Sequence, residues 1–213
     1  MKKIGIIGSG AVAKVLGSGF IKHGYEVMIG SREAAKIDEW KTKEPKGKTG
    51  SMEDAAAFGD ILVLTVKGSG AENAIDIIKK NIDGKIIIDT TNPIADAPPQ
   101  NGVLNYFTPM NESLMEILQK KAPSAKFVKA FNSVGNAFMV DPQFPDGKPT
   151  MFICGNDAEA RKEVSIILVQ FGWEVSDMGT AEAARPIESL CILWCIPGFI
   201  GNGWMHAFKL MKM

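Results

Sequence analysis

A glycine-rich turn near the start of the chain has a residue pattern that suits phosphate binding. Residues 8–13 read G-S-G-A-V-A and match G-x-G-x-x-A, directly after an apolar run at residues 4–7. If this turn belongs to a dinucleotide-binding fold, Gly8 permits the tight turn, Gly10 lets the backbone approach a pyrophosphate, and Ala13 keeps the helix close to the strand. The N-terminus of the following helix then offers free N–H groups to phosphate. An ordinary strand-to-helix turn without a ligand is the alternative interpretation.

A second pattern identifies which dinucleotide this turn would hold. The residue that contacts the adenosine ribose lies about twenty residues beyond the glycines, and in NAD-binding proteins it is an Asp or a Glu. This chain has Ser31 and Arg32 there, with Lys36 placed to add positive charge on the same side. A guanidinium group and a hydroxyl group attract a 2′-phosphate, whereas a carboxylate repels it. We therefore expect NADP(H); a solvated arginine at a helix start is the alternative.

Three later segments follow apolar runs and could line the rest of the site. Ligands of open α/β sheets lie outside the carboxyl ends of the strands. Val66 and Lys67 follow the third run, Asn92 and Pro93 follow the fourth, and Asn132 follows the fifth. The two asparagine amides suit a carboxamide or a ring carbonyl, although each could equally serve a turn. For Lys67 we favour a phosphate contact or simple solvation over a catalytic role.

Composition excludes several classes of function. The 213 residues carry 24 basic and 24 acidic side chains, so nucleic acid is not an expected partner. Three cysteines form no disulfide framework, which suits a reducing, cytoplasmic location. Cys191 and Cys195 lack further ligands for a metal, so core packing is expected and no metal site is predicted. The start of the chain does not read as a signal peptide, and the proline, glycines and polar residues within 190–208 argue against a membrane span.

The order of elements predicts an α/β, NAD(P)-binding Rossmann fold with a doubly wound, mainly parallel sheet. We expect a Rossmann domain over residues 1–180 and a helical tail over 181–213 that forms an acceptor pocket and a dimer contact. Proline and glycine around 197–203 predict two tail helices with a bend. Expected strands are 4–7, 27–29, 61–66, 85–89, 126–130, 151–154 and 173–176; expected helices are 11–23, 32–42, 71–80 and 157–171, with a charged loop at 43–48 and a capped helix from Ser51.

No pair of acid–base groups and no nucleophile constellation is evident in the sequence. Hydride transfer between two cofactor rings needs positioning rather than such groups. An NADP(H)-dependent oxidoreductase acting on a flat second cofactor is therefore the favoured hypothesis. A non-catalytic NADP-binding redox sensor or scaffold is one alternative. An NADPH reductase of a small imine or ketone is another, and it would need a proton donor such as Lys67 or Ser133.

Several motifs together resemble the NADPH-dependent reductases of coenzyme F420, a deazaflavin, along nearly the whole chain. These motifs are G-S-G-A-V-A, G-S-R at 30–32, S-M-E-D-A-A at 51–56, D-I-L-V-L-T-V at 60–66, K-A-F-N-S at 129–133, C-G-N-D at 154–157 and A-R-P-I-E-S-L at 184–190. K-A-F-N-S and T-N-P at 91–93 also resemble the reductase domains of metalloreductases, which use NADPH and a flavin.

The resemblance implies a homodimer with the second cofactor, F420, FAD or FMN, lying against the C-terminal helices. It implies that the loops after the third and fourth strands, at Val66, Lys67, Asn92 and Pro93, flank the nicotinamide. It also implies cofactor contacts at a set of residues shared between the glycine turn and the ribose position: Ser9, Gly10, Ala11, Val12, Ser31, Arg32 and Lys36.

Overall fold

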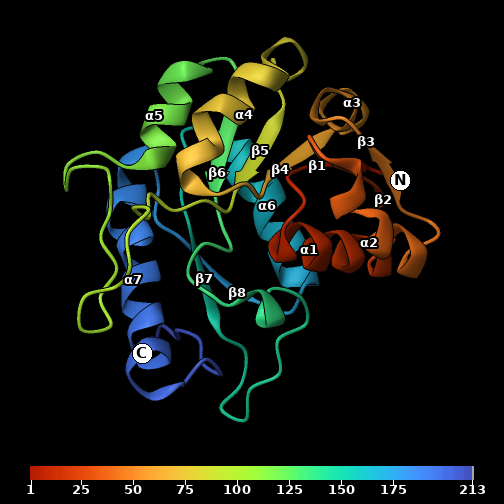
Figure 1. The fold of residues 1–213 in the computed structure, drawn as a ribbon. Helices are drawn as coiled ribbons and strands as arrows, with labels where there is room; N and C mark the ends of the chain where they lie inside the picture. The colour runs from red at the N-terminus through yellow and green to blue at the C-terminus, as the bar shows by residue number, and fades with distance from the viewer. Residues whose placement is uncertain (213) are drawn as a thin grey trace.

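The computed structural model describes residues 1–212, and a six-stranded parallel sheet forms its centre (Figure 1). Residue 213, the last of the predicted tail, lies outside the described residues. The strand order β3-β2-β1-β4-β5-β6 reverses direction between β1 and β4, which confirms the predicted doubly wound Rossmann fold. The strands are β1 (Lys3–Ile7), β2 (Glu26–Gly30), β3 (Lys48–Gly50), β4 (Ile61–Leu64), β5 (Ile86–Asp89) and β6 (Lys126–Lys129).

Helices cover both faces of this sheet, which explains the continuous apolar runs of its strands. Ile4 and Ile6 of β1 join one apolar cluster, formed with α1 (Ala11–Lys22), α2 (Asp38–Lys43) and α6 (Ala158–Gln170). Ile7 joins the cluster on the other face, formed with α3 (Met52–Phe58), α4 (Ala71–Ile78), α5 (Leu114–Lys121) and the start of α7 (Ala184–Gly201). Alternate residues of one strand thus serve the two cores.

Two further strands extend the sheet region next to β6. β7 (Thr150–Ile153) and β8 (Glu174–Asp177) pair in parallel, and an antiparallel bridge between Lys129 and Cys154 links them to β6. Both strands were expected, within one residue of their bounds. The bridge brings the end of β6 close to the segment after β7.

Helix α7 runs uninterrupted through Pro197, so the predicted pair of tail helices is wrong. The helix ends at Asn202, whose backbone is left-handed (φ 56°). The chain then folds back, and the Trp204 ring fills the space beside Gly198, where a Cβ atom would lie 2.4 Å from the ring. Because this contact replaces a second helix, Phe208 reaches β7 and its carbonyl accepts a hydrogen bond from Thr150 N (2.8 Å).

Among the described residues, one helix, Ala181–Gly201, is long and apolar enough to cross a membrane, with 33% of its most apolar window buried. Within its α-helical part, α7, the two charged residues Arg185 and Glu188 form ion pairs with α5 and β6 respectively. Both charges therefore have partners within the fold.

Two other expectations need correction. The predicted helix over 32–42 is a short 3₁₀ turn (Ala34–Lys36) followed by α2, because the chain turns to bury Ile37 and Trp40 against α1. The predicted loop at 43–48 leads into β3, which pairs with β2. Helix α5 was not anticipated, although Ser113 and Glu116 form a complete capping box at its start.

The Glu116–Arg185 pair predicts a loss of stability in acid. Arg185 Nε and Nη2 donate to the two Glu116 carboxylate oxygens at 3.0 and 2.6 Å, and mainly for this reason the pKa of Glu116 falls to about 2. A lowered folded-state pKa adds stability above the unfolded pKa, and this is lost as pH falls from about 5 to 2. We expect Glu116→Gln to cost about 1 to 2 kcal/mol at pH 6, after allowance for solvent around Arg185.

Urea unfolding of both proteins at several pH values measures this difference. It should shrink steadily towards pH 2. A difference that stays constant with pH would contradict the assignment of the stabilisation to the ionised carboxylate.

Candidate functional site

The glycine turn is locked between β2 and β4. Gly8 has φ +129°, and a Cβ atom there would lie 2.6 Å from the hydroxyl oxygen of Thr65. Gly8 N donates to Gly30 O at 3.0 Å, and Thr65 Oγ1 donates to Ile7 O at 3.0 Å. Gly8 is therefore required by the fold itself, because any side chain would be strained and would collide.

Gly10 differs, since the fold leaves the space beside it open. It is the N-cap of α1; no side chain of residues 1–212 caps that helix end, and the first turn contains no acidic residue. A Cβ atom at Gly10 would meet nothing within 4 Å. The uncapped N–H groups after it, in the turn containing Ala11 and Val12, attract anions. The glycine at this position suits close approach of a phosphate, and the predicted pyrophosphate fits the turn.

The predicted ribose-binding residues lie beside the glycine turn. Ser31 is buried; its hydroxyl lies 3.0 Å from Ser9 Oγ and accepts a hydrogen bond from Glu33 N (3.1 Å). Arg32 is exposed. These residues line a cavity of about 190 Å³, together with Gly8, Gly10, Lys36, Met52, Thr65, Val66 and Lys67. A second cavity of about 240 Å³ shares Arg32, Met52, Val66 and Lys67 with the first.

Two of the lysines near these cavities already have acidic partners. Lys36 Nζ donates to Glu33 at 2.7 Å, and this hydrogen bond lowers the pKa of Glu33, so that carboxylate stays ionised. Lys67 forms an ion pair with Asp96, in the loop after β5, and the hydrogen bond lowers the pKa of Asp96. An anionic ligand would compete with these carboxylates for both lysines, whereas within residues 1–212 no acidic partner is seen for the Arg32 side chain.

Asn92 and Asn132 bind each other. Asn92 Nδ2 donates to Asn132 O at 2.8 Å, and Asn132 Nδ2 donates to Asn92 Oδ1 at 3.1 Å and to Ile187 O at 2.9 Å. Asn132 Oδ1 is buried and has no hydrogen-bond partner among the residues that the structure describes. The structure thus brings these asparagines together, with Pro93 buried beside them, but none of the three lines the two cavities described above.

Close packing joins the asparagine pair to the loop after β4. A Cβ atom at Gly68 would lie 1.9 Å from Asn92 O, so glycine is needed for the two loops to touch. Phe131, directly before Asn132, is fully buried in a left-handed conformation with φ +63°. Strain of this kind is retained where surrounding structure holds a residue in place, often at functional sites. The loops at the carboxyl ends of β4, β5 and β6 therefore pack into one continuous surface.

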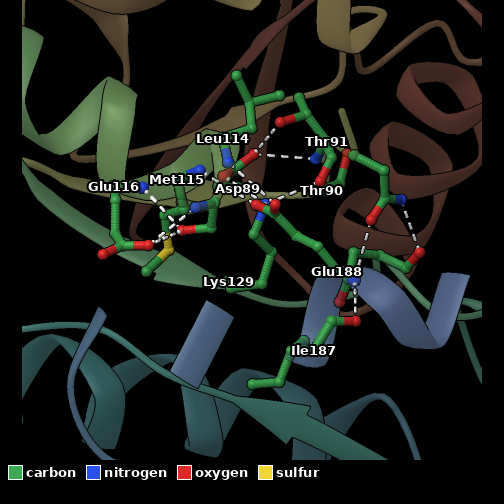
Figure 2. A network of polar contacts seen from close by, with 12 residues as sticks. Asp89, Thr90, Thr91, Leu114, Met115, Glu116, Lys129, Ile187 and Glu188 are labelled. Atoms are coloured by element: carbon green, nitrogen blue, oxygen red, sulfur yellow. Dashed lines mark hydrogen bonds and ion pairs between the residues drawn. The ribbon is translucent and has the colours of Figure 1, made fainter. Parts of the chain in front are cut away.

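Beneath this surface lies a buried ion cluster that sequence reasoning missed (Figure 2). Lys129 Nζ lies 2.7 Å from Asp89 Oδ2 and 2.8 Å from Glu188 Oε1, and it donates to Thr91 O at 2.7 Å. The side chains of Lys129 and Asp89 are 0% exposed. Burial acts to lower the pKa of Lys129, but the two carboxylates outweigh it and the pKa is raised. One feature of the sequence could have indicated this cluster: Lys129 is the last residue of one apolar strand, and Asp89 is the last residue of the neighbouring strand.

The tail cysteines pack in an apolar cluster, as predicted. Cys191, Cys195 and Trp194 are buried together. Within residues 1–212, no group of three or more His, Cys, Asp or Glu side chains could hold a metal ion. Burial also raises the pKa of Cys154 to about 12, so this thiol is protonated at neutral pH.

Residues 3–93 match the family described as NADP oxidoreductase, coenzyme F420-dependent. The F420-dependent NADP reductase of Methanocaldococcus jannaschii is 30% identical, over 78% of this chain and 78% of its own length. Metalloreductase STEAP3 of Rattus norvegicus is 26% identical over 97% of this chain, but the chain spans only 40% of that protein. A crystal structure from Arthrobacter sp. FB24, assigned as an F420-dependent NADP-reductase, superposes with a TM-score of 0.92 at 28% identity, covering 100% of both chains.

The open space at Gly10 and the crowding at Gly8 predict opposite effects of a single methyl group. Gly10→Ala should weaken NADPH binding about tenfold or more and change the free energy of unfolding by less than about 1 kcal/mol. Gly8→Ala should destabilise the protein by more than about 1 kcal/mol, because of its positive φ and the contact with Thr65. Calorimetric titration and urea unfolding measure the two quantities. Equal destabilisation by both variants would contradict the ligand-based role of Gly10.

The exposed guanidinium predicts selectivity between the two nicotinamide dinucleotides. Arg32→Glu should weaken NADPH binding about a hundredfold and NADH binding less than about threefold, because only NADPH carries the 2′-phosphate. Lys46→Glu, the same change of charge in the exposed loop before β3, is the matched control. Equal losses for NADPH and NADH would refute the assignment of Arg32 to that phosphate.

Proposed function

Because this chain belongs to the family of coenzyme F420-dependent NADP reductases, we propose that it passes hydride between NADP(H) and a tricyclic deazaflavin or flavin ring. Its class, an NADP-dependent oxidoreductase, follows from the relatives. The alternative hypothesis of a non-catalytic redox sensor or scaffold is not retained, because these relatives are reductases. The identity of the acceptor is the part that we propose.

The donor half of the proposal places NADP(H) across the glycine turn. Backbone N–H groups at Ser9–Val12 would hold the phosphates, while Ser31, Arg32 and Lys36 would hold the 2′-phosphate. Val66 and Lys67 line the same cavities, and the Asn92–Asn132 pair with Pro93 lies one loop further on, towards which the nicotinamide would extend. Bound NADPH supplies the hydride, and these residues supply its position.

The acceptor assignment rests on one observation: the ionisable groups beneath the asparagine pair are buried and form ion pairs. Asp89, Lys129 and Glu188 are all buried, and both carboxylates pair with Lys129, so none of the three is available as a proton donor to a substrate carbonyl or imine. Hydride transfer between two stacked rings needs no such donor beside the nicotinamide. This favours a ring acceptor over a small ketone or imine.

Helix α7 supports the proposed acceptor pocket and a dimer contact. It abuts the asparagine pair through the hydrogen bond between Asn132 and Ile187 O. Leu193 and Ile200, two turns apart on one side of α7, are 54% and 69% exposed, and Phe199 next to Ile200 is 44% exposed. Apolar side chains gathered on one face indicate an interaction site. We propose a second copy of this chain as the partner on that face, and a cytoplasmic location.

The likeness to a metalloreductase along 97% of the chain favours a flavin as the second candidate acceptor. Anaerobic mixing of the protein and NADPH with coenzyme F420, FMN or FAD separates these acceptors. We expect NADPH-dependent bleaching of the F420 or flavin absorbance, with NADH at least about tenfold less effective. Failure with all three rings, together with turnover of a small imine or ketone, would overturn the proposal.

A further inference from the structure

Lys129 lies where four elements of the structure meet. It ends β6, while its partners Asp89 and Glu188 come from β5 and α7. Glu188 in turn accepts hydrogen bonds from Leu114 N (2.9 Å) and Met115 N (3.1 Å) at the start of α5 (Figure 2). The cluster carries a net charge of −1, and the N-terminus of α5 partly offsets it.

The cluster fixes every polar group of Thr91. Lys129 donates to Thr91 O, while Thr91 N and Oγ1 donate to Asp89 Oδ1 at 2.9 and 2.7 Å. The next residue is Asn92, which binds Asn132. Lys129 therefore holds the residue directly before Asn92, so the position of the asparagine pair depends on the Lys129 ammonium group through the backbone of Thr91.

The same cluster fixes helix α7. Glu188 is bound through its carboxylate, while its backbone carbonyl accepts a hydrogen bond from Tyr106 and the carbonyl of Ile187 accepts one from Asn132. A change at Lys129 would therefore shift the loop on the donor side and the helix on the acceptor side relative to each other.

Stability alone does not explain such a cluster. Well-packed apolar residues of similar volume are often as stable as a buried ion pair, because ions lose their hydration on burial. A buried polar network does, however, specify one arrangement of the groups around it. That property matters most where two reacting rings must be held at a fixed distance.

We propose that Lys129 is a positioning residue that sets the separation between the nicotinamide at the Asn92–Asn132 pair and the acceptor ring against α7. The proposal rests on the proposed function. Because Lys129 lies away from the glycine turn, its removal should leave binding of NADPH nearly intact and slow the transfer step.

Two variants separate positioning from mere charge balance. Lys129→Met leaves two carboxylates buried and unbalanced, and it should be less stable. Lys129→Met combined with Glu188→Gln restores the net charge of −1, and its stability should recover towards that of the wild type. The donor to Thr91 O is still missing in this double variant. A role in charge balance alone predicts that the transfer rate recovers with stability; positioning predicts that the rate stays low.

Lys85→Met is the matched control at the opposite end of β5. Lys85 Nζ donates to Ala56 O (2.8 Å) and Gly59 O (2.9 Å), far from the carboxyl ends of the strands. Single-turnover reduction of coenzyme F420 or FMN by NADPH is measured for all variants at a temperature where they are folded. We expect the double variant to transfer hydride at least about tenfold more slowly with NADPH affinity within about threefold, and Lys85→Met to transfer at the wild-type rate.

A wild-type rate in the double variant, or an equal loss in Lys85→Met, would overturn the inference. A second readout needs no acceptor. The buried ammonium of Lys129 should give a slowly exchanging NMR signal that shifts when NADP⁺ is added, whereas that of Lys85 should not. An unmoved Lys129 signal would also overturn it. A wild-type protein inactive with both acceptors would instead contradict the proposed function, and the NMR result alone would then decide the role of Lys129.

Discussion

The pairing of the Lys129 ammonium group with two buried carboxylates is the constraint on which the arrangement of the site depends. Removal of one member of such a pair typically costs about 3 to 5 kcal/mol, because the remaining charge stays buried. Asp89 of β5 and Glu188 of α7 form ion pairs with Lys129, and the backbone at the start of α5 donates a hydrogen bond to Glu188. A single cluster therefore fixes the relative positions of two strands and two helices. The loops that carry the asparagine pair follow directly after these strands, so the cluster also determines where the pair lies.

The glycine turn is built by a separate set of contacts. Gly8 is fixed by Thr65, and Gly10 is left open at an uncapped helix end. The two regions meet where Gly68 touches Asn92. A donor site formed by backbone groups is thus joined to a surface set by buried charges, so substitutions in one region should leave the other largely unchanged.

Prediction from the sequence succeeded where a structure is determined by residues close together along the chain. Apolar runs buried on both faces identify parallel strands, and the G-x-G-x-x-A turn with Ser31 and Arg32 marks one wall of a cavity that the structure contains. It failed where contacts between distant parts of the chain determine the local structure. The burial of Ile37 and Trp40 breaks the helix expected at 32–42, and Trp204 packing against Gly198 replaces a second tail helix. Lys129 escaped notice because its partners lie 40 and 59 residues away along the chain.

A crystal structure of the protein with NADP⁺ bound would test the central claim most directly, because it locates the nicotinamide ring relative to the ion cluster. The account predicts the 2′-phosphate within hydrogen-bond distance of Arg32, the carboxamide at the Asn92–Asn132 pair, and Lys129 still between Asp89 and Glu188. A nicotinamide ring bound away from the loop after β5, or a cluster opened by the cofactor, would contradict it.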